Sequence, residues 1–220
     1  MSCAVFKYLA VFSMLLDHIA VVFLPPQSNA YLLLRGLGRA AFPIFSYLLV
    51  QGFIHTRNLK KYIARLLAFG VLAEVPFDLA AFGSAFDFRA QNTLFTLALA
   101  LLVLDALSKI ERGRFSAPTI CAGLLAACAS EFFHTDYGIF GILLIVALYV
   151  WRSDPRGQLL VVLVFGLCTA RGIYFPAFLA TGICLCFGNG KRGNLRFARL
   201  FYWFYPAHLL ILVCLKMLIR

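Results

Sequence analysis

The sequence predicts an all-α fold, a polytopic bundle of transmembrane helices that forms a single domain over residues 1–220. Hydrophobic residues make up 63% of the chain, whereas soluble domains hold roughly 45–50%. Charged residues make up 13% of it, about half of the usual share. Apolar runs of membrane-spanning length, about 20 residues each, follow one another without an intervening polar domain. These observations exclude a water-soluble domain.

Nine apolar runs separated by polar breaks predict about nine spans. The first run is too long for a signal-peptide core and carries Asp17-His18, so we expect it to be retained. The stretch 158–188 is interrupted only around Arg171. We interpret it as two short helices, because a single helix would place the basic residues of 191–199 on the outer side. The nine runs are 4–24, 36–55, 62–82, 93–108, 116–133, 137–151, 158–170, 172–188 and 198–219.

Basic residues mark one side of the predicted bundle. The loops 57–65, 109–114, 152–156 and 191–199 hold 4, 3, 2 and 4 Lys or Arg residues. Since Lys and Arg are enriched in cytoplasmic loops, the N-terminus is predicted to be cytoplasmic and the C-terminus outside. The formal charge of +11 then reflects membrane orientation, and we expect no nucleic-acid partner. The expected location is a bacterial inner (cytoplasmic) membrane, with membrane lipid around the spans.

Ionisable side chains gather at one depth inside the spans. A charge at the bilayer centre costs about 2.5–3.5 kcal/mol, so each one requires a partner or a wet cavity. Their shared depth is the outer half of the membrane, which predicts a polar chamber on that side. The residues concerned are Asp17, His18, Arg35, Arg39, Glu74, Asp78, Glu131, His134, Asp136 and Arg171.

Two histidines are candidate catalytic bases. His18 lies in the first span, and His208 lies in the middle of the last one, two residues after Pro206. Adjacent side chains on a helix point about 100° apart, so Asp17 cannot hold His18 by itself. We expect Asp17 to pair with Arg39 instead.

The carboxylates of Glu74 and Asp78 lie four residues apart on one face of the third span. Two interpretations stay open. Either they bind the substrate, or they pair with Arg35 or Arg39, because an unpaired charge inside the membrane is costly.

A second group of charges is predicted at the cytoplasmic face. His55 ends the second span, about 24 Å of helix away from Arg39, so the two cannot share one compact site. Glycines around Lys191-Arg192 allow two cations to approach a phosphate closely. These charges either only orient the chain or bind a polyphosphate, with His55, Arg57 and Lys60 beside them. The sequence holds no metal-binding motif, and no metal is expected.

Short motifs along the whole chain carry a family resemblance. They are Lys7-Tyr8 with Leu16-Asp17-His18, Gly38-Arg39 with Phe42-Pro43-Ile44-Phe45, Gly52-Phe53-Ile54-His55-Thr56-Arg57, Lys61-Tyr62 with Arg65-Leu66, Pro76-Phe77, Asp136-Tyr137-Gly138, Asn189-Gly190-Lys191-Arg192-Gly193, and Phe201-Tyr202 to Tyr205-Pro206 with His208. In this order and spacing, they resemble the TraX family of membrane acetyltransferases.

The resemblance implies an acetyl-CoA-dependent N- or O-acetyltransferase, because the member that gives the family its name acetylates the amino terminus of a conjugative pilin subunit. It also implies that His18 is catalytic, as an early-span histidine is in the larger group of membrane acyltransferases. Acyl-CoA would bind at the cytoplasmic face. The outer chamber would bind the acceptor through Glu74, Asp78, Asp136 and Tyr137.

We therefore expect a membrane acyltransferase that moves an acetyl or acyl group from cytoplasmic acyl-CoA to an amine or hydroxyl at the outer half of the membrane. The acceptor is a peptide such as a pilin N-terminus, a glycan or a small molecule. Two alternatives stay open: a proton- or ion-coupled transporter, and a pilus or envelope assembly factor that acts only by binding. Many transporters carry internal repeats, and we see none in this sequence.

Overall fold

The computed structural model describes residues 1–111, 117–169, 174–191 and 200–219. Within these ranges the regular elements are all α-helices, and the only β-type contact is an isolated bridge between Gln91 and Thr135. The prediction of an all-α fold is confirmed. The helices are α1 (Cys3–Phe23), α2 (Asn29–Gly38), α3 (Ala41–His55), α4 (Leu59–Ala81), α5 (Thr93–Glu111), α6 (Ala117–Phe132), α7 (Gly138–Val150), α8 (Pro155–Thr169), α9 (Phe175–Cys186) and α10 (Leu200–Ile219).

The predicted second span corresponds to two helices, α2 and α3. Arg39 and Ala40 between them keep right-handed helical backbone angles, so Asn29–His55 forms one apolar stretch of 27 residues. The helix therefore begins seven residues before the predicted start at residue 36. Its beginning is fixed by Ser28, whose side chain accepts a hydrogen bond from the Tyr31 backbone N–H, as expected of an N-cap.

The stretch 158–188 holds two helices, α8 and α9, as predicted. Arg171, between them, lies outside the described residues. When α2 and α3 are taken together, the helical segments of the described chain match the nine predicted ones. Four of them are long and apolar enough to cross a membrane, namely α1, α2 with α3, α5, and Phe201–Ile219 of α10. The side of the membrane that each loop faces stays a prediction.

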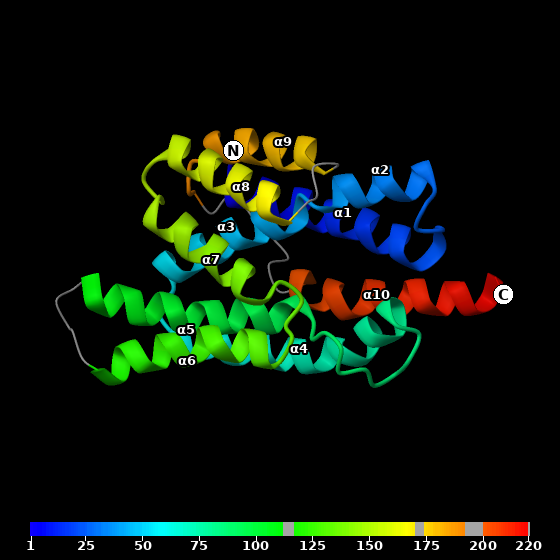
Figure 1. The fold of residues 1–220 in the computed structure, drawn as a ribbon, viewed down its shortest axis with the longest axis horizontal. Helices are drawn as coiled ribbons and strands as arrows, with labels where there is room; N and C mark the ends of the chain where they lie inside the picture. Colours follow the sequence, from blue (N-terminus) through cyan, green and yellow to red (C-terminus); the bar gives the residue numbers. More distant parts are fainter. Residues whose placement is uncertain (112–116, 170–173, 192–199, 220) are drawn as a thin grey trace.

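The helices form an elongated bundle and run roughly along its long axis (Figure 1). α4, α5, α6 and α10 lie in the lower part of that view, and α1, α2, α3, α7, α8 and α9 lie in the upper part. The end of α3, the start of α4, the end of α7 and the start of α8 gather at the left end. The basic stretches 57–65 and 152–156 therefore lie at the same end of the bundle.

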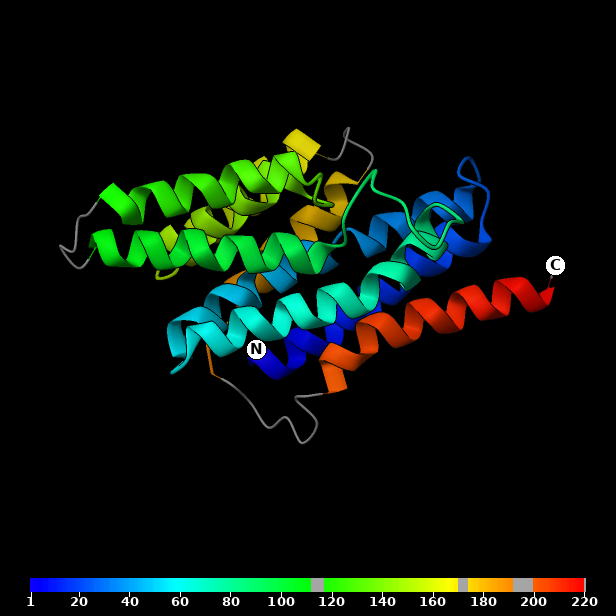
Figure 2. The same cartoon turned by 90° about the horizontal axis from the view of Figure 1, so that it is seen from below.

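Two buried clusters hold the helices together. The larger one joins α1, α3, α4, α5, α7, α8 and α9 through residues such as Phe6, Leu101, Ile145 and Phe178. The smaller one joins α1, α3, α4 and α10, with Leu209 fully buried in it. Figure 2 shows α10 running beside α4 on the side away from α6. Apolar burial stabilises both clusters by roughly 25 cal/mol per Å², and the candidate site lies between them.

Candidate active site

An elongated cavity of about 370 Å³ lies between the two buried clusters. Its walls come from α1, α3, α4, α5 and α10, with the turn before α7 and the segment after α9. Along α1 the lining extends from Cys3 to His18, which is about 22 Å of helix. We call the end lined by Lys7, His55 and Arg65 the basic end, and the end lined by Asp17, His18, Thr93, Asp136, Tyr137 and Tyr205 the chamber end.

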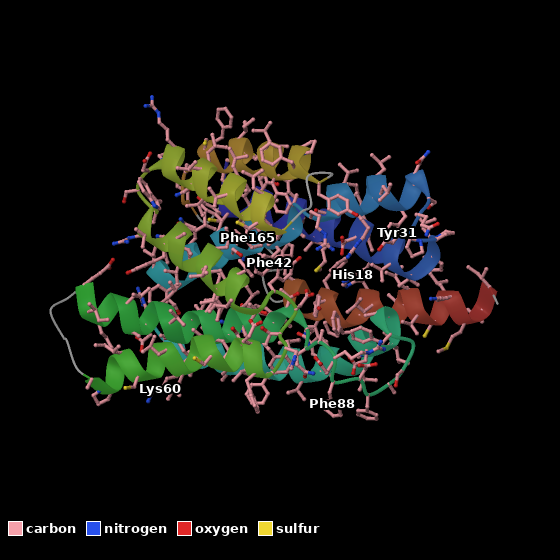
Figure 3. The ribbon with its side chains drawn as sticks, in the orientation of Figure 1. His18, Tyr31, Phe42, Lys60, Phe88 and Phe165 are labelled. Atoms are coloured by element: carbon pink, nitrogen blue, oxygen red, sulfur yellow. The ribbon has the colours of Figure 1, made fainter. Side chains whose placement is uncertain are left out.

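The part between these two ends is apolar. Phe42, Phe45, Leu48 and Leu97 line it, so the passage from one end to the other excludes strongly hydrated groups. Figure 3 shows Phe42 and His18 in the interior of the bundle, whereas Lys60 lies at its periphery. A slender, mostly apolar chain fits such a passage better than a charged one does.

The two candidate histidines contact each other, although they lie 190 residues apart. His18 Nδ1 lies 2.8 Å from His208 Nε2. His208 Nδ1 in turn lies 2.6 Å from the carbonyl oxygen of Phe204, one helical turn earlier. His208 is 5% exposed and is not among the residues that line the cavity, whereas His18 lines it.

This network assigns the protons of the neutral pair. A carbonyl oxygen only accepts, so His208 Nδ1 carries the proton that it donates to Phe204, and His208 Nε2 is left with a lone pair. That lone pair accepts the Nδ1 proton of His18. His18 Nε2 is then the unprotonated nitrogen, and because His18 lines the cavity, it can act as a base there while His208 orients it. The sequence offers His18 and His208 as alternative bases. In the structure His18 lines the cavity, whereas His208 does not.

Asp17 pairs with arginines of α2, next to the histidine pair. It accepts a hydrogen bond from Arg35, and its Oδ1 lies 3.4 Å from Arg39 Nη2. The expected contact with Arg39 is present, and Arg35 adds a second one. A Cβ on Gly38 would overlap the Asp17 side chain, so glycine is required where α1 and α2 approach. Ser13 supports the same contact by donating to the Leu37 carbonyl at 2.6 Å.

Of the two open interpretations of Glu74 and Asp78, pairing with Arg35 or Arg39 is not the arrangement found among the described residues. Glu74 accepts a hydrogen bond from the Asn92 side chain, and Asp78 accepts one from the Asp87 backbone N–H at 2.9 Å. Neither residue is among those that line the cavity. Each instead fastens the start of α5 or the loop before it to α4, because the two arginines already share the nearer carboxylate of Asp17.

Asp136 and Tyr137 line the chamber end as a pair. The Thr93 hydroxyl donates to Asp136 Oδ2 at 2.7 Å, and the Tyr137 ring stacks on Phe42 with 3.5 Å between ring centroids. Tyr205 completes this wall beside His18, with their ring centroids 6.2 Å apart. These groups give the chamber end one carboxylate and several hydroxyls within a small volume.

The sequence places Thr93 on the side of the predicted chamber but assigns no catalytic or binding role to Thr93 or Tyr205. Thr93 follows Asn92 at the start of a helix that faces the predicted chamber, and this signal was available. Tyr205 belongs to a run of aromatic residues that is typical of an interfacial belt, so its role depends on a contact that the sequence does not reveal.

At the basic end, the structure separates the predicted donor-binding residues. His55 lines the cavity, whereas Arg57, Lys60 and Lys191 are not among the lining residues. Gly190 lines the cavity, and its φ of 64° is readily adopted by glycine. Arg192 lies outside the described residues.

The start of α1 is tied to the segment after α9 at this end. The Cys3 backbone N–H donates to the Lys191 carbonyl at 2.9 Å, and that of Asn189 donates to the Met1 carbonyl at 3.0 Å. These bonds hold Gly190 against the cavity. Within the part of the chain that the structure describes, no cluster of His, Cys, Asp or Glu has the arrangement of a metal site.

Comparisons with known proteins agree with one another. The family model described as TraX protein matches residues 2–216. A protein of Dichelobacter nodosus named "Probable fimbrial assembly protein FimC, serogroup H1" is 34% identical, over 97% of this chain and 95% of that protein. "Protein TraX" of Escherichia coli is 32% identical over 72% of this chain, and the match covers 60% of that relative's length. No solved structure gives a significant match.

Proposed function

This chain belongs to the TraX family, and we propose that it is a membrane acyltransferase that moves an acetyl group from acyl-CoA to an amine or hydroxyl acceptor. The observation that carries the proposal is the cavity, which joins cations at one end to a histidine with a free base nitrogen at the other. The donor would enter at the basic end, and the acceptor would meet it at the chamber end. The bacterial inner membrane is the proposed location.

The reaction follows from the position of His18. His18 Nε2 removes a proton from the acceptor, whose nitrogen or oxygen then attacks the carbonyl carbon of the thioester. The new C–N or C–O bond forms as the C–S bond breaks, and the imidazolium returns the proton to the thiolate of CoA. An imidazole nitrogen can accept a proton and later donate it, so one group serves both transfers.

The other residues of the chamber end position the reactants. His208 keeps the proton of His18 on Nδ1. Asp136 and the hydroxyls of Thr93, Tyr137 and Tyr205 are suited to hydrogen-bond the acceptor and the thioester carbonyl. The apolar middle of the cavity would limit the passage of water from the basic end to the chamber end, so transfer would be favoured over hydrolysis.

The acceptor class is part of the proposal. The Dichelobacter nodosus relative, which the chain matches over nearly its full length, is named as a probable fimbrial assembly protein. That name supports a fimbrial or pilus subunit as the acceptor. It equally favours a second candidate function, in which the chain assists fimbrial assembly by binding alone.

The test uses the purified protein in lipid nanodiscs with acetyl-CoA and a set of amine and hydroxyl acceptors, including peptides with free amino termini. We expect release of free CoA thiol together with an acetylated acceptor found by mass spectrometry, and we expect His18→Ala to abolish both. If a folded protein transfers nothing while it still binds a fimbrial subunit, the assembly function replaces this proposal. Flux of a solute in proteoliposomes, without transfer, would indicate a transporter.

A further inference from the structure

Lys7 and Arg65 both line the basic end of the cavity, although they come from different helices, α1 and α4. Lys7 Nζ lies over the ring of Phe201, 5.8 Å from its centroid. The Arg65 guanidinium lies over the ring of Tyr202, 4.9 Å from its centroid, and also contacts Tyr62 at 5.7 Å. Phe201 and Tyr202, two consecutive aromatic residues of α10, therefore each hold one positive charge at the basic end of the cavity.

We propose that Lys7 and Arg65 form a clamp for the diphosphate of the acyl-CoA donor. The inference rests on the proposed acyltransferase function and names the part of the donor that is recognised. The rings hold these cations by their faces, and the Arg65 guanidinium also hydrogen-bonds the Tyr202 side chain. A guanidinium carries five N–H donors, so others are available for phosphate oxygens. In the part of the chain that the structure describes, Arg65 forms no ion pair with a carboxylate.

The length of the donor supports this placement. Lys7 and His18 both line the cavity on α1, and the 11 residues between them correspond to about 16 Å of helix. The pantetheine chain has about twelve bonds between the diphosphate oxygen and the sulfur. An extended chain covers about 3.3–3.6 Å per three bonds, so pantetheine spans about 14 Å. A diphosphate held at Lys7 and Arg65 thus brings the thioester to His18.

The same cations line the cavity together with His55 and Thr56, where α3 ends. The stretch 57–65, which contains Arg65, holds three other basic residues. Arg57, Lys60 and Lys61 do not line the cavity. The proposal therefore separates cations that face the donor from cations that only add to the charge of that end. Lys61 provides a matched control, because it lies on α4 one helical turn before Arg65.

The experiment compares two donors, acetyl-CoA and S-acetylpantetheine, which lacks the diphosphate. The variants are Lys7→Gln, Arg65→Gln and the control Lys61→Gln, each in phosphatidylcholine nanodiscs. We expect Lys7→Gln and Arg65→Gln each to raise the KM for acetyl-CoA about tenfold or more, since a hydrogen bond to a charged group contributes about 1.5–3 kcal/mol. The kcat with saturating acetyl-CoA, and all parameters with S-acetylpantetheine, should stay at the parental values. Lys61→Gln should leave the KM and kcat for both donors at the parental values.

Several results would overturn the clamp. Arg65→Gln could behave like Lys61→Gln with acetyl-CoA, or it could impair both donors equally, which would indicate a structural role. A third result concerns lipid phosphate. If the substitutions change only a dependence on added phosphatidylglycerol and not the KM for acetyl-CoA, the cations bind headgroups. A parental protein that uses neither donor would contradict the acyltransferase function itself, and would therefore be distinguishable from failure of the clamp.

Discussion

Replacing His208 distinguishes the role of the proposed base, His18, from that of the residue proposed to orient it, His208. His208→Leu removes the acceptor of the His18 Nδ1 proton and the donor to Phe204. His18 then loses its fixed tautomer but keeps its place on the cavity wall. His208→Gln is the matched variant, because an amide oxygen can still accept the His18 proton.

The hydrogen bonds give the expected magnitudes. A neutral hydrogen bond contributes about 0.5–1.5 kcal/mol net, so its loss should lower kcat by about 2- to 13-fold. Loss of a general base costs about 10²–10⁴-fold. We therefore expect the order parental, His208→Gln, His208→Leu and, far below them, His18→Ala.

Initial rates of transfer with saturating acetyl-CoA measure this order, and calorimetric acetyl-CoA binding checks that each variant keeps its donor site. The pH profile adds a readout that a merely structural role would not move. It should change in His208→Leu and return toward the parental profile in His208→Gln. A folded His18→Ala protein with near-parental transfer, beside an inactive His208→Leu, would refute the assignment and make His208 the base.

Three further substitutions test the surroundings of the site. Asp17→Asn should lower both the melting temperature and activity, because removing one partner of a largely buried ion pair costs about 3–5 kcal/mol; thermal unfolding in detergent measures it. Gly38→Ala should destabilise by about 1–3 kcal/mol through overlap with Asp17, whereas Gly36→Ala, whose nearest neighbour would lie at 3.4 Å, should unfold at nearly the parental temperature. Gly52→Ala would put a Cβ 2.8 Å from the Tyr62 hydroxyl beside the cavity, so it should raise the KM for acetyl-CoA, and an unchanged KM would contradict a donor path there.

Much of the fold could be predicted because each span is a local pattern. Runs of apolar residues identified the helices, and the loop charges separated α8 from α9 correctly. The predicted second span begins at residue 36, whereas α2 begins at Asn29. The Ser28 N-cap was a local signal for the true start, and it lies in a stretch that is less apolar than the spans.

Partners between helices could not be predicted in the same way. Burial cost required that Glu74 have a partner, but many polar groups lie at the same depth. Asn92 takes that role because its side chain reaches back to α4 from the start of α5. Likewise, Lys7 contacts Phe201 and Arg65 contacts Tyr202, two consecutive residues of a distant helix. Such contacts depend on how helices pack, and the spacing within one helix does not encode them.

The adjacent residues Asp17 and His18 illustrate how one turn of α1 organises the chamber end. Their side chains point about 100° apart, so they contact different neighbours. Asp17 contacts the arginines of α2, and His18 contacts His208 of α10. The carboxylate that neutralises the arginines is therefore not the group that orients the imidazole. With Phe204 as the last acceptor, the histidine pair receives its orientation from a neutral carbonyl, and His18 can gain and lose a proton without breaking the ion pair that holds α1 against α2.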